Sequence, residues 1–564
     1  MRAVVLFCAG AVVLAAGCSS AHYRKSADKQ VYKIISQTES NQFGKASGFS
    51  IDTPYSKRNP RDVKAEEIVG DRLKDGQVFL TISDALALAT TNSRTYQTRK
   101  EQLYLTALTL TRTRHEFRPQ LSGTGTGTAQ RNANGTRQDE LASRLSLSQF
   151  FKTGARLGVA VANDVVSYYS GTPSRTAVST LSVDLVQPLL RGAGTEAAAE
   201  DLTQGTRNVI YEVRSFDRFQ TTFSVDVVNA YFRLLQRKDT VRNEYNTYLN
   251  LILSRERSEA LSVDRLPKYQ VDQAQQDELR AKVRYLQAIE SYRDGLDSFK
   301  GTLGLPLGMD IKLDDGTVKE LTDIGLPQLD LDERKGFSLA VAKRLDVINE
   351  IDRFEDSQRK IRVAANFLKP DLNVFARTSL DSQGVVDYTK FNLNDYKASA
   401  GVSLGLPFDR LAERNNYRTT FITFERQLRQ LGITLDDLRD SVRQGIRSLE
   451  LARQSYEIQK LSVALADRRV ESATMLLQAG RAQIRDLLEA QSAQLQARNA
   501  FTAALFDYHS TRLTLLRDLG ILDVGQEKFW LKDQALPKGV KPDVQESAST
   551  GQGAVITPEE LFGK

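Results

Sequence analysis

Val271-Asp272-Gln273-Ala274-Gln275 and Leu303-Gly304-Leu305 each recur 216 residues later, as Leu487-Leu488-Glu489-Ala490-Gln491 and Leu519-Gly520-Ile521 (487 − 271 = 216; 519 − 303 = 216). Equal offsets leave no insertion or deletion between the two pairs, so a long regular element is duplicated. Two further pairs lie upstream: residues 117–121 with 367–372, and 187–191 with 406–410. One unit is therefore present twice, and a repeat constrains the architecture more than any single residue does. Chance similarity between Ala-, Gln- and Leu-rich helices is the alternative, and four pairs in the same order count against it.

Helical patterns of unusual length fill both copies. The spacing predicts a helix over residues 195–261, which would be about 100 Å long at 1.5 Å per residue, and another over 268–302. The second copy predicts helices over 337–366 and 413–477, followed by one lined by Ile484, Leu488 and Leu495. A first helix begins after Thr81 and ends before Pro119. Such amphipathic helices need neighbours along their whole length to bury their apolar stripes.

Alternating segments lie between the helices, in residues 119–188 of the first copy and 370–407 of the second. Segments of about ten residues that alternate apolar and polar side chains are typical of transmembrane β-barrel strands. The first segment is longer (188 − 119 = 69; 407 − 370 = 37) and has a tight-turn candidate at Lys152-Thr153-Gly154. It holds either four strands or two long strands with a large external loop. Since open sheet edges are excluded from a membrane, and one chain has too few strands for an open pore, several copies must share one barrel.

The N-terminus has the layout of a bacterial secretory signal. Arg2 precedes an apolar run over residues 3–16, and Gly17-Cys18-Ser19-Ser20 follows. We expect residues 1–17 to be a signal peptide and Cys18 to be lipidated, with ordinary cleavage as the alternative. Cys8 lies in the removed segment, so the mature chain has no disulfide. This start indicates a bacterial envelope protein, and Ser19, rather than Asp, after a lipidated Cys18 resembles the signal for sorting to the outer membrane.

The remaining boundaries follow from composition. We expect an extended arm over residues 18–79, a first copy over 80–305, a linker over 306–335, a second copy over 336–522 and a flexible tail over 523–564.

Charge and histidine content argue against other classes of function. The formal charge is +7, and Lys and Arg are interleaved with Asp and Glu, which is not typical of a nucleic-acid-binding protein. The three histidines, His22, His115 and His509, lie far apart and form no metal or triad pattern. We therefore predict a protein that is not an enzyme, with no cofactor and no metal.

This arrangement resembles the TolC family of outer-membrane efflux proteins over roughly residues 80–522. The resemblance rests on the order of five pieces: Ser83-Asp84-Ala85-Leu86, Gln187-Pro188-Leu189-Leu190-Arg191-Gly192, Ala479-Gly480-Arg481, Asp486-Leu487-Leu488-Glu489-Ala490-Gln491 and Leu519-Gly520. It implies an α+β membrane protein that forms a homotrimer, with a long periplasmic α-helical barrel and a shared transmembrane β-barrel. Such a trimer is a passive exit duct for efflux or type I secretion, and a periplasmic adaptor and an inner-membrane transporter are its partners.

The resemblance also suggests site residues at the periplasmic entrance. Asp486 and Glu489 fall where the family often has the carboxylates that narrow the pore. They are three residues apart and share a helix face, so a trimer would gather six carboxylates and attract cations. The alternatives are two solvated side chains, or ion pairs with Arg481 and Arg485.

The turns between helices are the candidate adaptor contacts. Gly480 matches the family's turn glycine, followed by Arg481; the first copy has Asp264 and Arg265 in that place. The two turns therefore differ in chemistry. A second class of function remains open, a lipid-anchored coiled-coil scaffold that bridges envelope layers without a pore.

Overall fold

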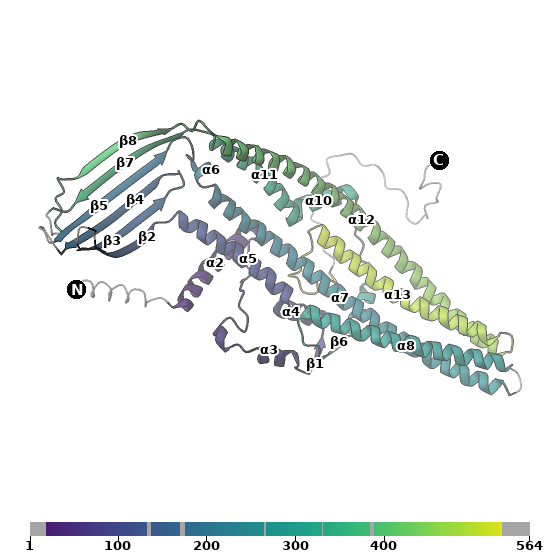
Figure 1. Ribbon diagram of the computed structural model, residues 1–564. Coiled ribbons are helices and arrows are strands. Elements are labelled where there is room, and N and C mark those ends of the chain that lie inside the picture. The colour runs from purple at the N-terminus through teal and green to yellow at the C-terminus, as the bar shows by residue number, and fades with distance from the viewer. Residues whose placement is uncertain are drawn as a thin grey trace.

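Two long helical hairpins and one antiparallel sheet make up most of the chain. The computed structural model describes residues 19–131, 133, 137–169, 175–263, 267–329, 331–383 and 389–532. The sheet lies at one end of an elongated molecule, and the tips of both hairpins lie at the other (Figure 1). The signal peptide, Cys18, Asp264, Arg265 and the tail beyond Lys532 lie outside the described residues.

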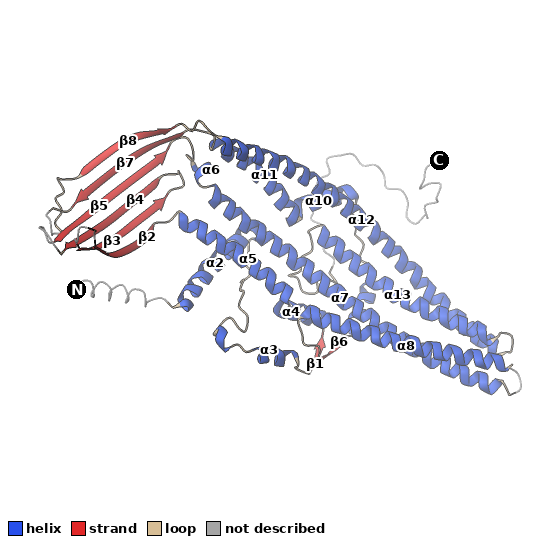
Figure 2. Cartoon of the chain, viewed as in Figure 1, coloured by secondary structure: helices blue, strands red, loops and turns tan. Residues whose placement is uncertain are grey.

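The helices form a single curved layer. The first copy contributes α4 (Ile82–Asn92), α5 (Arg94–Glu116), α6 (Thr195–Ala198), α7 (Glu200–Leu261) and α8 (Lys268–Leu303). The second contributes α10 (Glu333–Lys343), α11 (Leu345–Asn366), α12 (Leu411–Gln478) and α13 (Ile484–Asp518). Towards the tips, α7 packs between α8 and α13, and α13 packs on α12. Towards the sheet, α7 packs between α5 and α11, and α11 packs on α12 (Figure 2).

The duplication is visible in matching helix ends. Gly304 and Gly520 both have φ of 72°, and each ends the last helix of its copy. The Leu305 amide donates to the Lys300 carbonyl (2.9 Å) and the Ile521 amide to the Leu516 carbonyl (3.2 Å), the bond of a Schellman cap. A Cβ on Gly304 would lie 2.3 Å from the Asn92 oxygen, and one on Gly520 would lie 2.9 Å from the Arg344 nitrogen.

Each of these glycines therefore packs against the break in the first helix of its own copy. The sequence predicts one helix after Thr81, but the structure divides it into α4 and α5, because Ser93 has an extended backbone (φ −66°, ψ 125°) beside which Gly304 packs.

The sheet has six strands in the order β2-β3-β4-β5-β7-β8. They are β2 (Gln120–Arg131), β3 (Arg137–Phe150), β4 (Arg156–Tyr168), β5 (Arg175–Pro188), β7 (Asp371–Asp381) and β8 (Lys397–Gly405), and all pairs are antiparallel. The first copy thus has four strands, with the turn at Gly154 (φ 95°), as the extra-hairpin alternative proposed. β2 and β8 are the sheet's edges.

The strand register gives the sheet one apolar and one polar face. Paired residues share a face, and one row reads Leu145, Val161, Leu181 and Leu380 across four strands. The neighbouring row on the other face reads Thr124, Arg144, Ala162, Thr180 and Asp381. This alternation is the pattern of strands with lipid on one side and water on the other.

No helix within the described ranges is long and apolar enough to cross a membrane.

The arm expected to be extended over residues 18–79 is largely folded. It contains α2 (Ser20–Phe43), a 3-10 turn (Pro60–Asp62), α3 (Ala65–Arg72) and β1 (Gly76–Leu80). α2 is capped by Ser19 and Gly44, and it buries Val31, Ile34 and Ile35 against α5 and α7. These three apolar residues are too few to stand out in a polar segment, which explains the wrong expectation.

The expected linker and tail also contain packed structure. In the segment 306–335, β6 (Met309–Leu313) pairs in parallel with β1, and α9 (Gly316–Ile324) follows. Phe529 and Trp530 are 2% and 4% exposed and belong to the main core. The tail is therefore anchored at least as far as these two side chains.

Candidate functional site: hairpin tips, layer edges and the network between the copies

The α12–α13 turn is shaped by Gly480. This residue has φ of 69°. Its amide donates to the Leu477 carbonyl (3.1 Å), and the Arg481 amide donates to the Leu476 carbonyl (2.8 Å). A Cβ at Gly480 would meet nothing within 4 Å, so only the backbone conformation favours glycine here.

Both predicted constriction carboxylates lie just beyond this turn and are exposed. Asp486 accepts a hydrogen bond from the Gln483 amide (3.0 Å) and completes a capping box at the start of α13. Glu489 pairs with Arg469 of α12 (2.7 Å), and both side chains are at least half exposed. The partner of Glu489 is thus Arg469, rather than the Arg481 or Arg485 that the sequence suggested. Gly480, Arg481, Asp486 and Glu489 share one tip, whereas Asp264 and Arg265 lie outside the described residues.

The first hairpin is joined by a different contact. Arg255 near the end of α7 pairs with Glu259 of its own helix (2.7 Å) and with Glu278 of α8 (2.5 Å). Each hairpin therefore has one arginine that crosses to a glutamate of its second helix. In α12–α13 that arginine is Arg469.

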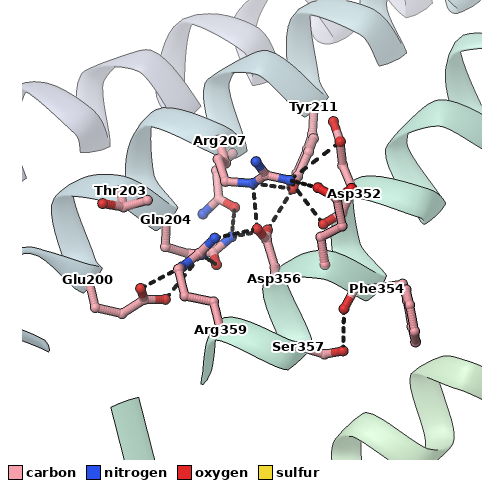
Figure 3. Close-up of polar contacts among 12 residues, drawn as sticks. Glu200, Thr203, Gln204, Arg207, Tyr211, Asp352, Phe354, Asp356, Ser357 and Arg359 are labelled. Carbon is pink, nitrogen blue, oxygen red and sulfur yellow. Dashed lines mark hydrogen bonds and ion pairs between the residues drawn. The ribbon is translucent and has the colours of Figure 1, made fainter. Parts of the chain in front are cut away.

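A polar network joins the two copies where α7 lies beside α11 (Figure 3). Asp356 of α11 is 3% exposed and lies at its centre. Tyr211 donates a hydrogen bond to Asp356 (2.6 Å), Arg207 pairs with it, and Arg359 pairs with it at 2.7 Å. Arg359 also reaches Glu200 of α7 (2.7 Å).

The network is fully compensated in charge. Burial would raise the pKa of Asp356, but the bonds from Tyr211 and Arg359 and the charge of Arg207 hold it below its usual value. A carboxylate that is paired on three sides is a poor base. Removing one partner would leave a buried charge unpaired, which is strongly destabilising, so the network is a joint that holds the two copies together. The sequence analysis missed it, since its members lie about 150 residues apart and form no local pattern.

A polar groove opens beside this joint. It is lined by side chains of α5, α7, α11 and α12, among them Thr106, Asn208, Glu212, Lys360 and Thr423. On α5, Tyr104 donates to Asp28 of α2 (2.7 Å), whereas Thr106, two residues on, lines the groove. Two residues turn a helix by about 200°, so the groove and α2 lie on opposite faces of the layer.

The two edge helices expose apolar stripes. On α8, Leu279, Val283 and Leu286 point away from α7 and are 52–55% exposed. On α12, Ile458, Leu461 and Leu465 are 61–67% exposed. Stripes of this kind at helical spacing are typical of helices that pack against a further helix.

The two stripes lie at the same level along the helix axes, which we call their height. Val283 corresponds to Asn499 in the second copy (283 + 216 = 499). On α13, the flanking Gln494 bonds Asp467 of α12 (2.7 Å), and Phe501 packs on Tyr456 of α12. Residues 456–467 of α12 therefore lie at the height of the α8 stripe, and they include the exposed α12 stripe.

The outer membrane efflux protein family model matches residues 337–520 of this chain. Among solved structures, the chain is similar to the CmeC outer membrane channel of Campylobacter jejuni (15% identity, TM-score 0.57). It is also similar to the outer-membrane channel OprN (13%, 0.58) and to the outer membrane protein VceC of Vibrio cholerae (14%, 0.55). Each match covers 78% of this chain, and 85%, 89% and 96% of the respective structures.

No curated protein sequence is a significant match. The family model and the structures confirm the predicted resemblance and the α+β fold of long helices and a sheet. The family model describes outer membrane efflux proteins, and CmeC and OprN are outer-membrane channels.

Proposed function

We propose that this chain, which carries an outer membrane efflux protein domain and has the fold of outer-membrane channels, is one of three identical subunits of a passive exit duct. The apolar face of the sheet contacts lipid, and the polar face lines a pore. The helical layers close into a periplasmic barrel whose inner surface includes the polar groove. Lipidated Cys18 anchors each subunit to the outer membrane.

The matched stripes of α8 and α12 are the observation that carries this proposal. A ring of identical subunits requires a stripe on each edge helix at the same height, because α12 of one subunit then packs on α8 of the next subunit. The lone chain leaves both stripes in water. A contact between two different edges repeats around an axis, and it closes into a ring when the rotation between neighbouring subunits divides a full turn.

The two free edges of the sheet lie on the same sides of the molecule as the two edge helices. β2 follows α5, and β8 leads into α12, so the free strand edges lie on the same two sides as the unpaired helices. Pairing β8 of one subunit with β2 of the next subunit removes every open edge of this sheet, as a membrane requires. This sheet has six strands among the described residues, so three subunits supply 18 strands, and barrels of about 16–18 strands leave an aqueous channel.

The duct supplies no energy. Its transport is powered by partners, an inner-membrane transporter and a periplasmic adaptor. The adaptor docks at the α12–α13 turn near Gly480 and Arg481, and at the turn that the sequence places near Asp264 and Arg265. Efflux and type I secretion both use such an assembly.

The detergent-solubilised mass and the conductance in a planar bilayer test the proposal together. We expect three chains per particle and a steady conductance with a preference for cations. A pore-less coiled-coil scaffold would give oligomers without conductance. A monomer without conductance would contradict the duct.

A further inference from the structure

A hollow with an excess of positive charge lies where the sheet meets the helices. Its volume is about 860 Å³, and it is lined by the end of α5, by α6 and the start of α7, and by the turn between β3 and β4. Three cationic side chains line it: Arg114 in the last turn of α5, Arg118 just beyond α5, and Lys152 in the strand turn. None of the three forms an ion pair with the described residues.

The remaining charged residues of the hollow do not offset these cations. Glu196 is the one carboxylate among the described lining residues, and it pairs with Arg362 (2.6 Å). Arg207 also lines the hollow, and it pairs with Asp356 of the joint. The two pairs compensate each other's charges, so the three unpaired cations give the hollow its net positive charge.

The electrostatic strain falls on the most buried of the three cations. Burial lowers the pKa of Arg114, and the charge of Arg118 lowers it further. Such a shift means that the surroundings disfavour the charged form of Arg114. An anion in the hollow would relieve this cost.

The hollow opens on the face of the helical layer opposite the polar groove. On α7, Thr206 lines the hollow, whereas Gln204 and Asn208 line the groove. Thr206 is two residues from each of them, and two residues turn a helix by about 200°. In the proposed duct the groove faces the pore, so the hollow faces outwards.

The hollow lies at the helical end of the sheet (Figure 1). Lys152 lies in the turn that joins β3 to β4 at this end, and the Gly194 amide holds the turn by donating to the Thr153 carbonyl (3.2 Å). β2 begins at Gln120, two residues after Arg118. The three cations therefore lie where the proposed membrane barrel leaves the bilayer on the periplasmic side.

An apolar surface begins directly beside the cations. Leu121 of β2 pairs with Leu147 of β3, and the two side chains are 70% and 37% exposed. Leu147 is two residues from Leu145 of the apolar row, so this pair lies on the face that contacts lipid in the proposed duct. Phe151, next to Lys152, is 39% exposed. A ligand that fits both surfaces has an anionic group and apolar chains.

We propose that this hollow binds the headgroup of an anionic phospholipid in the periplasmic leaflet of the outer membrane. Arg114, Arg118 and Lys152 contact the phosphate, and the acyl chains lie on Leu121 and Leu147. Arg and Lys form strong, charge-assisted hydrogen bonds to phosphate. A zwitterionic headgroup brings a cation of its own, which the hollow disfavours. The inference rests on the proposed function for the orientation of the sheet, but all five residues belong to one chain.

Native mass spectrometry of the full-length protein in a neutral detergent tests the site. The protein is titrated with phosphatidylglycerol and, separately, with zwitterionic phosphatidylcholine. We expect one phosphatidylglycerol per chain at concentrations at which phosphatidylcholine does not bind. The triple variant Arg114→Gln, Arg118→Gln and Lys152→Gln should bind phosphatidylglycerol at least about tenfold more weakly. Lys152→Gln alone, in an exposed turn, should weaken binding severalfold without affecting folding.

A matched control removes the same charge near the hairpin tips. Arg257→Gln, Lys268→Gln and Arg468→Gln are all at exposed positions, and this triple variant should bind phosphatidylglycerol as the wild type does. Because unpaired like charges repel each other, the hollow variant should melt no lower than the wild type when lipid is absent. Equal losses of binding in the two triple variants would overturn the site.

Three further outcomes would contradict the proposal in different ways. Equal binding of both lipids, or unchanged binding in the hollow variant, would overturn the site. Displacement of phosphatidylglycerol by an equal concentration of glycerol 3-phosphate would overturn the lipid as the ligand in favour of free phosphate. A conducting trimer that binds no phosphatidylglycerol would remove the site and leave the duct. A monomer with one bound phosphatidylglycerol would remove the ring and leave the site.

Discussion

The glycines at the ends of α8, α12 and α13 have a left-handed conformation, but their surroundings differ. Gly480, Gly304 and Gly520 have φ between 69° and 72°. At Gly480 the space for a Cβ is empty, whereas at Gly520 it would lie 2.9 Å from backbone atoms of Lys343 and Arg344. At the tip, only the left-handed backbone conformation favours glycine. At the end of each copy, the neighbouring backbone also leaves no space for a Cβ.

These surroundings predict unequal effects of alanine. Gly480→Ala should lower the free energy of unfolding by about 1 kcal/mol, the cost of a left-handed non-glycine residue. Gly520→Ala should lower it by more, because backbone must also move. Chemical unfolding of both variants by circular dichroism measures the difference. Equal losses would show that the close approach to α10 and α11 is unimportant.

His509 is a buried base without a hydrogen-bond partner among the described residues. It is 1% exposed, and burial together with the nearby Arg512 lowers its pKa to about 4. The unfolded chain has the ordinary value of 6.5 and therefore binds more protons between these two pH values. The stability linked to His509 is fully present above pH 6.5 and is lost as the pH falls towards 4.

The expected loss is about 3 kcal/mol, since each unit of pKa shift corresponds to about 1.4 kcal/mol. His509→Phe should flatten the fall in melting temperature between pH 6.5 and pH 4. His115→Phe, at an exposed position, is the matched control and should leave the fall unchanged. A variant at position 509 that keeps the wild-type pH profile would contradict this account.

At the scale of elements, the edge helices carry the association. In the proposed ring, Val283 on α8 of one subunit lies opposite Leu461 on α12 of the neighbouring subunit. Val283→Glu should weaken the trimer, because a charge would be buried without a partner. Adding Leu461→Lys should restore part of the association through a new ion pair.

Analytical ultracentrifugation in detergent measures this effect. The double variant Val283→Lys with Leu461→Lys is the matched control, since like charges should not restore the trimer. If both double variants associate equally, the two helices do not meet in the ring. Circular dichroism should show that all these variants keep their helices.

At the scale of the whole molecule, the hairpin tips set the charge at the proposed entrance. A trimer gathers three copies of Asp486 and Glu489 there, and three copies of Arg469 beside them. Asp486→Asn with Glu489→Gln removes six negative charges and leaves the arginines. The cation preference should therefore fall, and an anion preference is the expected limit.

The reversal potential in a salt gradient across a planar bilayer measures this preference. Glu425→Gln with Asp437→Asn on α12, a pair of the same charge far from the tip, is the control and should change it less. An unchanged reversal potential in the tip variant would mean that Asp486 and Glu489 do not line the entrance.

Long periodic elements could be predicted from the sequence nearly to the residue. The predicted helices over 268–302 and 413–477 are α8 (Lys268–Leu303) and α12 (Leu411–Gln478). The duplication and the turn glycine Gly480 were equally visible. These features depend on spacing and on backbone conformation, which are local and repeat many times within one element.

The tertiary structure alone decided where distant residues meet. α2 was missed because its three buried residues gain their meaning only from α5 and α7. The joint of Asp356 with Arg207 and Tyr211, the ion pair of Glu489 with Arg469, and the matched heights of the stripes all join residues far apart in the chain. A sequence states which side chains can form a contact, but the packing angle and register of whole helices determine which contacts form.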